Sequence, residues 1–219
     1  FQRIGRHMSC VGQIPEVWID VGARGGDCTL DAAAANPLLT VYAFEPDVQA
    51  ARDLTGILPN YIVLPLAVAE IDGCMQFHLN SNRATNSVLP LHSDGLHSWR
   101  GVNGLRTETV INVPSIRLDT FLSGMSIEQV TYLKIDTQGY DLSVLRSAGN
   151  LIRRIGKITL EVATHETPIY NGACIKTDIL QFMSKHEFHL VSVRQKTFGQ
   201  EENLTFIRGE CVGVESQRI

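Results

Sequence analysis

The stretch WIDVGARGGDCT, residues 18–29, decides the fold. The run Val17–Val21 is typical of a buried strand, and Asp27–Ala35 is typical of a helix with an acid in its first turn. Between them Gly22, Gly25 and Gly26 permit a tight turn that approaches a ligand closely. The free N–H groups at the start of such a helix attract anions. A glycine turn alone is weak evidence for a function, but this order predicts the start of an α/β domain.

Short apolar runs and helical stretches alternate along the rest of the chain. Further strands are predicted over 40–44, 62–68, 132–135 and 158–162, and further helices over 47–57, 140–148 and 177–186. This alternation predicts a mainly parallel sheet with helices on both faces. The last two predicted strands, 189–194 and 204–207, have no helix between them, so we expect an antiparallel pair at one edge of the sheet.

Residues 80–109 interrupt the alternation. They are rich in Asn, Ser, Gly and His, and they lie between two extra predicted strands, 75–79 and 110–116. A long irregular segment in a compact domain is usually a functional lid or a disordered loop, and the sequence supports both equally. The polarity of the segment suggests a cover over a ligand pocket. Because no linker or repeat divides the chain, we expect residues 1–219 to form a single domain.

The composition argues against several classes of protein. The net charge of −4 lacks the basic excess of a nucleic-acid or anionic-membrane binder. Five scattered cysteines without a CxxC pair predict neither a disulfide framework nor a zinc finger, and a reducing cytoplasm is the simplest location. The longest apolar stretch, 61–69, is far shorter than a membrane span. The histidines show no metal-ligand spacing, so no metal site is predicted.

A second motif, FEPD at 44–47, ends the next predicted strand. A carboxylate at Glu45 would lie beside the glycine turn, where such an acid accepts hydrogen bonds from ribose hydroxyls. Glu45 alone could be an acid that flanks a helix, but together with the glycine turn it indicates a nucleoside-containing cofactor. The turn reads GARGG rather than GxGxxG, and the preceding Asp20 could approach an ammonium group. S-adenosylmethionine, which has an amino-acid head group and no pyrophosphate, fits this pattern better than a dinucleotide.

A third motif, LKIDTQGYDLSVLRSAG at 133–149, places Asp136 at the carboxyl end of the fourth predicted strand, where open α/β sheets bind ligands. Asp136 could also be a plain turn or N-cap acid. In order and spacing, the blocks DVGARGGDCT, FEPD and KIDTQGYDLSVLRSAG resemble the FkbM-type family of S-adenosylmethionine-dependent methyltransferases. The segment LAVAEIDG at 66–73 is similar to a short segment of that family, and the similarity extends from about Val17 to Ile207.

The resemblance implies a class I methyltransferase (Rossmann-like) fold, with a seven-stranded, mostly parallel sheet that ends in an antiparallel hairpin. It also implies S-adenosylmethionine as cofactor and a hydroxyl on a small molecule, natural product, sugar or glycan as acceptor. Motifs and resemblance together predict cofactor contacts at Asp20, Gly22, Ala23, Arg24, Gly26, Glu45, Pro46, Ala67, Val68 and Asp136. The resemblance places Gly22, Ala23 and Arg24 at the methionine half, Glu45 at the ribose, Ala67 and Val68 at the adenine, and Asp136 near the transferred methyl.

Two departures from the family pattern concern the acceptor side: Arg24 stands where the family often has Asn, and Gln138 where it often has Glu. Asn86 and Ser87 in the TNSVL stretch resemble a polar element that the family has there.

A hydroxyl acceptor must lose its proton, and a carboxylate or imidazole within hydrogen-bond reach is the usual base. The candidates are Asp136, Glu161 at the end of the fifth predicted strand, and His165 just after it. Glu161 could instead be a satisfied strand-end acid, and His165 a loop residue. No nucleic-acid or membrane partner is expected, and the oligomeric state is not predicted. The alternative functions are a dinucleotide-dependent oxidoreductase and a catalytically silent module that binds the cofactor.

Overall fold

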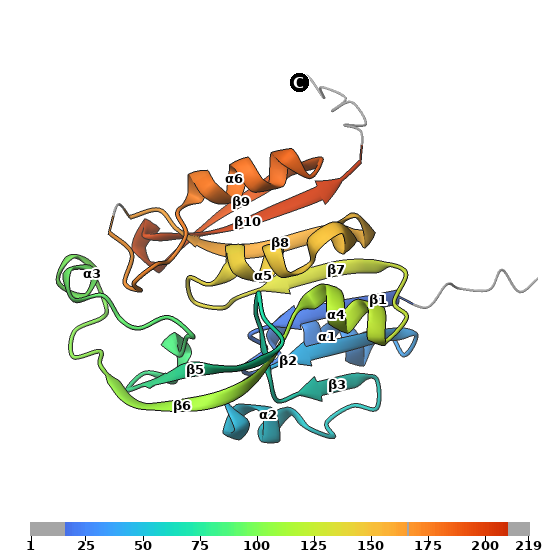
Figure 1. The fold of residues 1–219 in the computed structure, drawn as a ribbon, viewed down its shortest axis with the longest axis horizontal. Helices are drawn as coiled ribbons and strands as arrows, with labels where there is room; N and C mark the ends of the chain where they lie inside the picture. The colour runs from blue at the N-terminus through green and yellow to red at the C-terminus, as the bar shows by residue number, and fades with distance from the viewer. Residues whose placement is uncertain (1–15, 166, 210–219) are drawn as a thin grey trace, which may run out of the picture.

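A seven-stranded sheet forms the centre of the molecule (Figure 1). The computed structural model describes residues 16–165 and 167–209. In spatial order the strands are β3 (Tyr61–Leu64), β2 (Leu39–Phe44), β1 (Glu16–Val21), β7 (Val130–Ile135), β8 (Ile155–Ala163), β10 (Glu201–Arg208) and β9 (Phe188–Lys196). β10 runs antiparallel to both of its neighbours, and the other pairings in this sheet are parallel. The expected fold, with an antiparallel hairpin at one edge, is therefore confirmed.

Helices pack on both faces of the sheet. α1 (Asp27–Ala35) and α2 (Val48–Leu54) pack against β2 and β3, whereas α4 (Leu118–Gly124), α5 (Asp141–Ser147) and α6 (Lys176–Lys185) share a core with β1, β7, β8 and β10. Figure 1 shows α4 and α5 over the face that is turned to the viewer. From β1 the next strands, β2 and β3, are added toward one edge of the sheet, whereas from β7 the next strand, β8, is added toward the other edge. Because crossovers between parallel strands are right-handed, the two sets of helices lie on opposite faces.

Side chains that alternate between the two faces of the sheet fill two hydrophobic cores, a larger one beneath α4, α5 and α6 and a smaller one beneath α1 and α2. In β1, Ile19 and Val21 face the larger core, and Trp18 packs against the smaller one. Leu133 of β7 and Leu145 of α5 are fully buried in the larger core. Burial of such side chains stabilises the fold by about 1.5–3 kcal/mol each, which holds the strand ends in fixed relative positions.

The strand predicted over 62–68 is wrong as a single element. It divides at Pro65 into β3 and β4 (Ala67–Val68), because proline has no N–H for the ladder and breaks the pairing. β4 belongs to a second sheet, in which β6 (Thr107–Ile116) pairs with β4 and with β5 (Gly73–Asn80). The helix α4 follows β6 and was not predicted from the sequence.

The polar segment between β5 and β6 is ordered. It contains a 3-10 turn, η1 (Arg83–Thr85), and the short helix α3 (Ser93–Ser98). In Figure 1 this segment lies at the left, at the end of the sheet where β1 and β7 finish. The small sheet therefore places the segment next to the carboxyl ends of the parallel strands.

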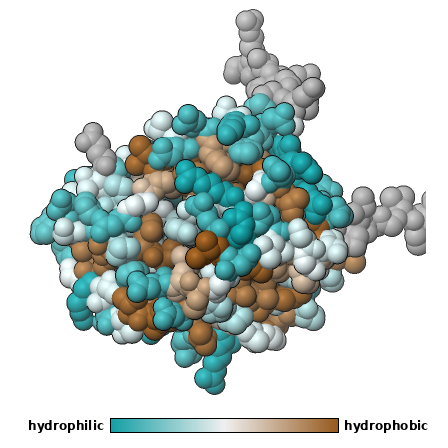
Figure 2. Space-filling model, viewed as in Figure 1, coloured by the Kyte–Doolittle hydropathy of each residue, from teal (hydrophilic) through white to brown (hydrophobic). Residues whose placement is uncertain are grey.

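The surface shows no single broad apolar area on the face seen in Figure 1. Figure 2 shows apolar side chains there in several separate groups among polar ones. Across residues 16–165 and 167–209, none of the helices has the length and apolar character that crossing a membrane requires.

Candidate active site

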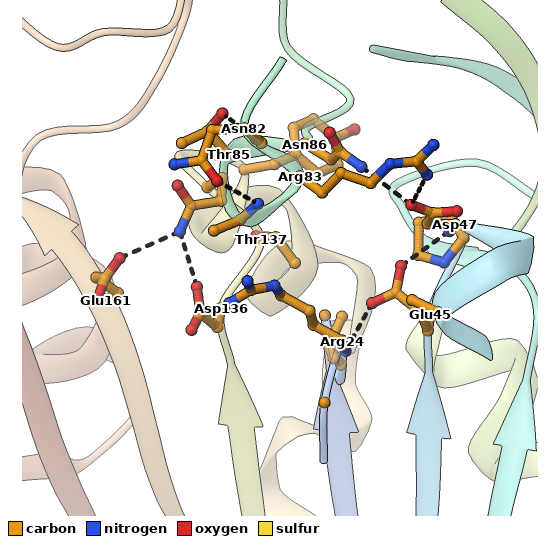
Figure 3. Close-up of a pocket in the computed structure, with 18 of the residues that line it drawn as sticks. Arg24, Glu45, Asp47, Asn82, Arg83, Thr85, Asn86, Asp136, Thr137 and Glu161 are labelled. Carbon is orange, nitrogen blue, oxygen red and sulfur yellow. Dashed lines mark hydrogen bonds and ion pairs between the residues drawn. The ribbon is translucent and has the colours of Figure 1, made fainter. Parts of the chain in front are cut away.

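A cavity of about 920 Å³ opens at the carboxyl ends of β1, β2, β7 and β8. The order of the strands reverses between β1 and β7, and open α/β sheets bind ligands at such a switch point. Residues of the β5–β6 segment (Figure 3) complete the wall, together with residues of the β9–β10 turn. Eight of the predicted site residues line this cavity: Gly22, Arg24, Glu45, Pro46, Ala67, Val68, Asp136 and Glu161.

The glycine turn after β1 touches the end of β7. Gly22 has a φ of +79°, and a Cβ built on it would lie 2.0 Å from the carbonyl oxygen of Asp136. The Asp136 N–H in turn donates to the carbonyl oxygen of Val21 at 2.9 Å. Only glycine permits this approach together with a positive φ, so the first and third motifs meet at one point.

Glu45 is buried at the end of β2, with its carboxylate held by backbone groups. One oxygen accepts from the N–H of Arg24 at 2.7 Å and the other from the N–H of Asp47 at 2.8 Å. Burial raises the pKa of Glu45, and these two hydrogen bonds oppose the rise. Each carboxylate oxygen has two acceptor directions, so both oxygens can still accept a hydroxyl hydrogen from the cavity.

Asp20, Ala23 and Gly26 do not line the cavity. Asp20 is fully buried, and its carboxylate accepts from the Thr29 hydroxyl at 2.5 Å and from Lys134 Nζ at 3.0 Å. Ala23 is buried in the smaller core, and Gly26 is the N-cap of α1. These residues join β1, α1 and β7, and so they fix the position of the glycine turn.

Asp136 and Glu161 lie on either side of Gln138. The Gln138 amide nitrogen donates to Asp136 Oδ1 at 3.0 Å and to Glu161 Oε1 at 3.2 Å (Figure 3). Lys196 Nζ lies 2.7 Å from the other Glu161 oxygen. Burial and the nearby Asp136 raise the pKa of Glu161, while Lys196 opposes this rise. Two of the three candidate bases are thus brought together in the cavity.

His165 is outside this cluster. Its ring lies beside Trp99, with 5.8 Å between the ring centroids, and its Nδ1 is 3.2 Å from the N–H of Thr167. Trp99 donates to the carbonyl oxygen of Thr167 at 2.6 Å, and Trp99 itself lines the cavity. His165 therefore supports the wall of the cavity from behind.

Asp47 connects the β5–β6 segment to the cofactor side of the cavity. Its carboxylate accepts from Arg83 at 2.7 Å and from Asn86 at 3.2 Å. Ser87 donates to the carbonyl oxygen of Gln138 at 2.9 Å. The polar pair Asn86 and Ser87 thus docks the segment on both sides of the cavity. The FEPD motif contains Asp47, but its sequence does not reveal this role.

The β9–β10 turn supplies cavity residues that sequence reasoning missed. They include Lys196, Glu201 and Phe198, a residue that is 77% exposed. Burial and the nearby Glu161 raise the pKa of Glu201 to about 7. This turn matches no motif, and only the return of β10 between β8 and β9 brings it to the cavity.

The donor set fits S-adenosylmethionine. The amino-acid head group of the cofactor carries a positive ammonium and a negative carboxylate. The cavity offers a partner of opposite charge for each, Asp136 and Arg24. Figure 3 shows the Arg24 side chain extending from the glycine turn toward Asp136. Glu45 offers acceptor positions for a ribose. Ala67 and Val68 add buried apolar surface at the same cavity.

Comparison with known proteins agrees with this geometry. The model of the methyltransferase FkbM domain matches residues 20–190. A 2-O-methyltransferase, NoeI, from Sinorhizobium fredii is 22% identical over 78% of this chain and 72% of its own. Among solved structures, the fibrillarin/Nop5p complex aligns with 90% of this chain and 74% of its own at 12% identity and a TM-score of 0.51, which shows a shared fold. The precorrin-6y C5,15-methyltransferase of Geobacter metallireducens GS-15 aligns with 90% of this chain and 82% of its own, at 12% identity and a TM-score of 0.48.

The family match includes the blocks DVGARGGDCT, FEPD and KIDTQGYDLSVLRSAG, the carboxyl ends of β1, β2, β7 and β8, and the whole of the β5–β6 segment. The chain therefore belongs to the FkbM family of methyltransferases.

Proposed function

We propose that the protein methylates a hydroxyl oxygen of a small-molecule, sugar or glycan acceptor. The observation that carries this proposal is the pair of carboxylates, Asp136 and Glu161, in the cavity beside the predicted cofactor residues. A hydroxyl acceptor needs a group that takes its proton, and a carboxylate can do so. The relative from Sinorhizobium fredii is a 2-O-methyltransferase, which supports an oxygen acceptor.

The cofactor side consists of the turn after β1 and the ends of β2 and β4. Gly22 and Arg24 would contact the methionine part, Glu45 would accept hydrogen bonds from the ribose, and Ala67 and Val68 would contact the adenine, with Pro46 beside them. The bound cofactor supplies an electrophilic methyl group. Asp20, Ala23 and Gly26 would act indirectly, by holding this turn and α1 in place.

The acceptor side consists of the ends of β7 and β8 and the β9–β10 turn. Asp136 is the first choice for the base, because Lys196 pairs with Glu161 and not with Asp136. A base within hydrogen-bond reach contributes about a hundred- to ten-thousandfold to such a reaction. His165, which does not line the cavity, is the last choice.

Turnover assays test the proposal. The protein is incubated with S-adenosylmethionine and a panel of sugars, glycans and small alcohols, and mass spectrometry follows the methylated product and S-adenosylhomocysteine. Asp136→Asn should lower the single-turnover rate at least about a hundredfold. The exposed Asp31→Asn is the matched control and should leave the rate unchanged. A wild-type protein that binds NADH but not S-adenosylhomocysteine would favour the oxidoreductase, and cofactor binding without any turnover would favour a silent module.

The β5–β6 segment is proposed to act as a lid over the acceptor side within a single domain. Support comes from Ser87, which contacts the carbonyl oxygen of Gln138, and from Val102, which lines the cavity. Deleting residues 82–104 should reduce turnover more than binding of S-adenosylhomocysteine, measured by calorimetry. If both measurements stay at the wild-type level, the segment is a passive surface loop.

A further inference from the structure

Phe198 lies at the rim of the cavity, on the turn between β9 and β10. It lines the cavity and is more exposed than any other large apolar residue in the part of the chain that the structure describes. It belongs to none of the hydrophobic clusters of those residues. Its nearest neighbour across the rim is Gly101, where a built Cβ would lie 3.6 Å from Phe198 Cε2. A flat apolar ring is therefore left uncovered beside the cavity.

The backbone of this turn has an unfavourable conformation at Phe198. Three consecutive residues have a positive φ: Thr197 at +45°, Phe198 at +58° and Gly199 at +81°. Glycine adopts such values freely, but a β-branched or bulky residue does so only at a cost. Strain of this kind is concentrated at sites that bind ligands, where the surrounding structure maintains it. The turn thus presents an aromatic ring at a position that would suit glycine better.

Hydrogen bonds hold the turn in this conformation. The N–H of Gln200 donates to the carbonyl oxygen of Thr197 at 3.0 Å, and the Gln200 side-chain oxygen accepts from the N–H of Arg100 at 3.1 Å. The Thr164 hydroxyl, which follows β8, donates to the carbonyl oxygen of Gly199 at 2.8 Å. The backbone is therefore fixed to the β5–β6 segment and to the end of β8, while the ring packs in no core. A group that is fixed before binding loses little entropy when a ligand covers it.

Hydrogen-bonding side chains lie close to this ring. Lys196 and Glu201 flank it in the turn, and both line the cavity. Glu161 also lines the cavity and lies deeper, since its side chain is 11% exposed. A carboxyl group can form a hydrogen bond with a hydroxyl in either protonation state, as acceptor or as donor. This side of the cavity therefore combines an apolar ring at the rim with groups that bind hydroxyls further in.

We propose that Phe198 selects the acceptor: its ring takes the flat carbon face of a polyhydroxylated ring, whose hydroxyls bond to Glu161 and Glu201. A polyhydroxylated ring matches both surfaces, because its C–H groups form one face and its hydroxyls lie along the edge. An open-chain polyol has no fixed flat face, and a simple phenol has too few hydroxyls. The proposal rests on the proposed function and narrows its acceptor to one class.

Acceptor kinetics test this role of Phe198. The full chain is assayed with S-adenosylmethionine and three sets of probes: inositols and methyl glycosides, hexitols, which are open-chain polyols, and simple phenols. Only the first set should be methylated well. Phe198→Ala should raise KM for a ring acceptor about tenfold and leave kcat within about twofold, because apolar contact is lost on binding. Phe198→Tyr keeps the ring and should behave as the wild type. Leu38→Ala removes an exposed apolar side chain outside the cavity and is the control.

Two further measurements separate ligand contact from a structural role. The Tm of Phe198→Ala should stay within about 3 °C of the wild type, because the ring packs in no core. Fluorine NMR of protein labelled with fluorophenylalanine, saturated with S-adenosylhomocysteine, detects binding without turnover. The resonance of Phe198 is the one missing in Phe198→Tyr. It should shift saturably with an inositol or a methyl glycoside and not with a hexitol.

Each outcome decides the inference. An unchanged KM in Phe198→Ala would overturn it, and so would equal use of hexitols or a preference for phenols. A fall in Tm larger than about 3 °C would show that the ring stabilises the fold instead. Saturable shifts in a protein that methylates no hydroxyl would support the ring-binding role and refute the proposed function. Methylation of alcohols that does not depend on Phe198 would do the reverse. Neither methylation nor a shift with any probe would refute both.

Discussion

Gly22 and Asp136 are in backbone contact, since a Cβ on Gly22 would lie 2.0 Å from the Asp136 carbonyl oxygen. The residue that shapes the cofactor turn and the first candidate for the base therefore cannot move independently. A change at either residue is expected to reach the other through this contact.

The first prediction compares two glycines of equal φ. Gly22→Ala should destabilise the fold by about 2–4 kcal/mol, because it adds a clash to an unfavourable φ of +79°. Gly56 has a φ of +81° and nothing within 4 Å of a built Cβ, so Gly56→Ala should cost only about 1 kcal/mol. Urea unfolding of both variants measures the difference. Equal losses would show that the backbone relaxes around the Cβ at Gly22.

The second prediction concerns the ribose. Glu45→Ala should weaken binding of S-adenosylhomocysteine about ten- to a hundredfold, because a hydrogen bond to a charged group is lost. The control is an analogue that lacks the ribose 2′-hydroxyl. The wild type should discriminate against this analogue, and Glu45→Ala should not. Equal discrimination by both proteins, measured by calorimetry, would mean that the carboxylate only holds the N–H groups of Arg24 and Asp47.

The third prediction concerns Asp141, which is fully buried, with one oxygen bonded to Thr137 and the other without a partner among the described residues. Burial raises the pKa of Asp141 from 3.8 to about 8. Between these values the folded state retains a proton that the unfolded chain loses, so stability should fall as the pH rises through this range.

Urea unfolding at about pH 5 and pH 9 checks this sign. Over that range the wild type should lose about 1–3 kcal/mol more than Asp141→Asn does. Asp31→Asn makes the same chemical change at an exposed position and should keep the wild-type slope. A wild-type slope in Asp141→Asn would show that the carboxyl at 141 is ionised in the folded protein.

The fourth prediction concerns the contact of Arg83 with Asp47. Arg83→Ala should change overall stability by no more than about 0.5 kcal/mol, because the arginine is largely exposed. It should nevertheless speed hydrogen exchange of the amides at 85–87, which lie in the docked segment. Arg106→Ala, which breaks a pair with Glu108 outside the cavity, is the control. Unchanged exchange in Arg83→Ala would show that Asn86 and Ser87 dock the segment without it.

Much of the fold could be predicted because the signals are local. The helix over Asp27–Ala35 begins and ends where its sequence pattern places it, since a glycine turn precedes it and Pro37 follows shortly after it. The strand over 62–68 was predicted wrongly because both of its halves are apolar. Periodicity cannot tell which of two sheets a short apolar run will join.

The residues of the candidate site could be predicted only where a motif lies at the end of a strand. Gly22, Glu45 and Asp136 follow from the rule that parallel strands end at one edge. Asp20 belongs to the same motif, but strand alternation turns its carboxylate toward Thr29 and Lys134. Lys196 and Glu201 come from a segment without any motif, and only tertiary packing brings them to the cavity.

The ends of the β5–β6 segment have a consequence for how relatives diverge. Asn80 and Thr107 are paired in the ladder, and their side chains are joined by a hydrogen bond of 2.8 Å. The segment therefore leaves and re-enters the small sheet at one fixed point. Loops closed in this way tolerate changes of length at a cost of only about 0.6 kcal/mol per doubling. Evolution, or a protein engineer, can exchange the whole segment for one of different size and chemistry while the strand ends that surround Glu45 stay as they are.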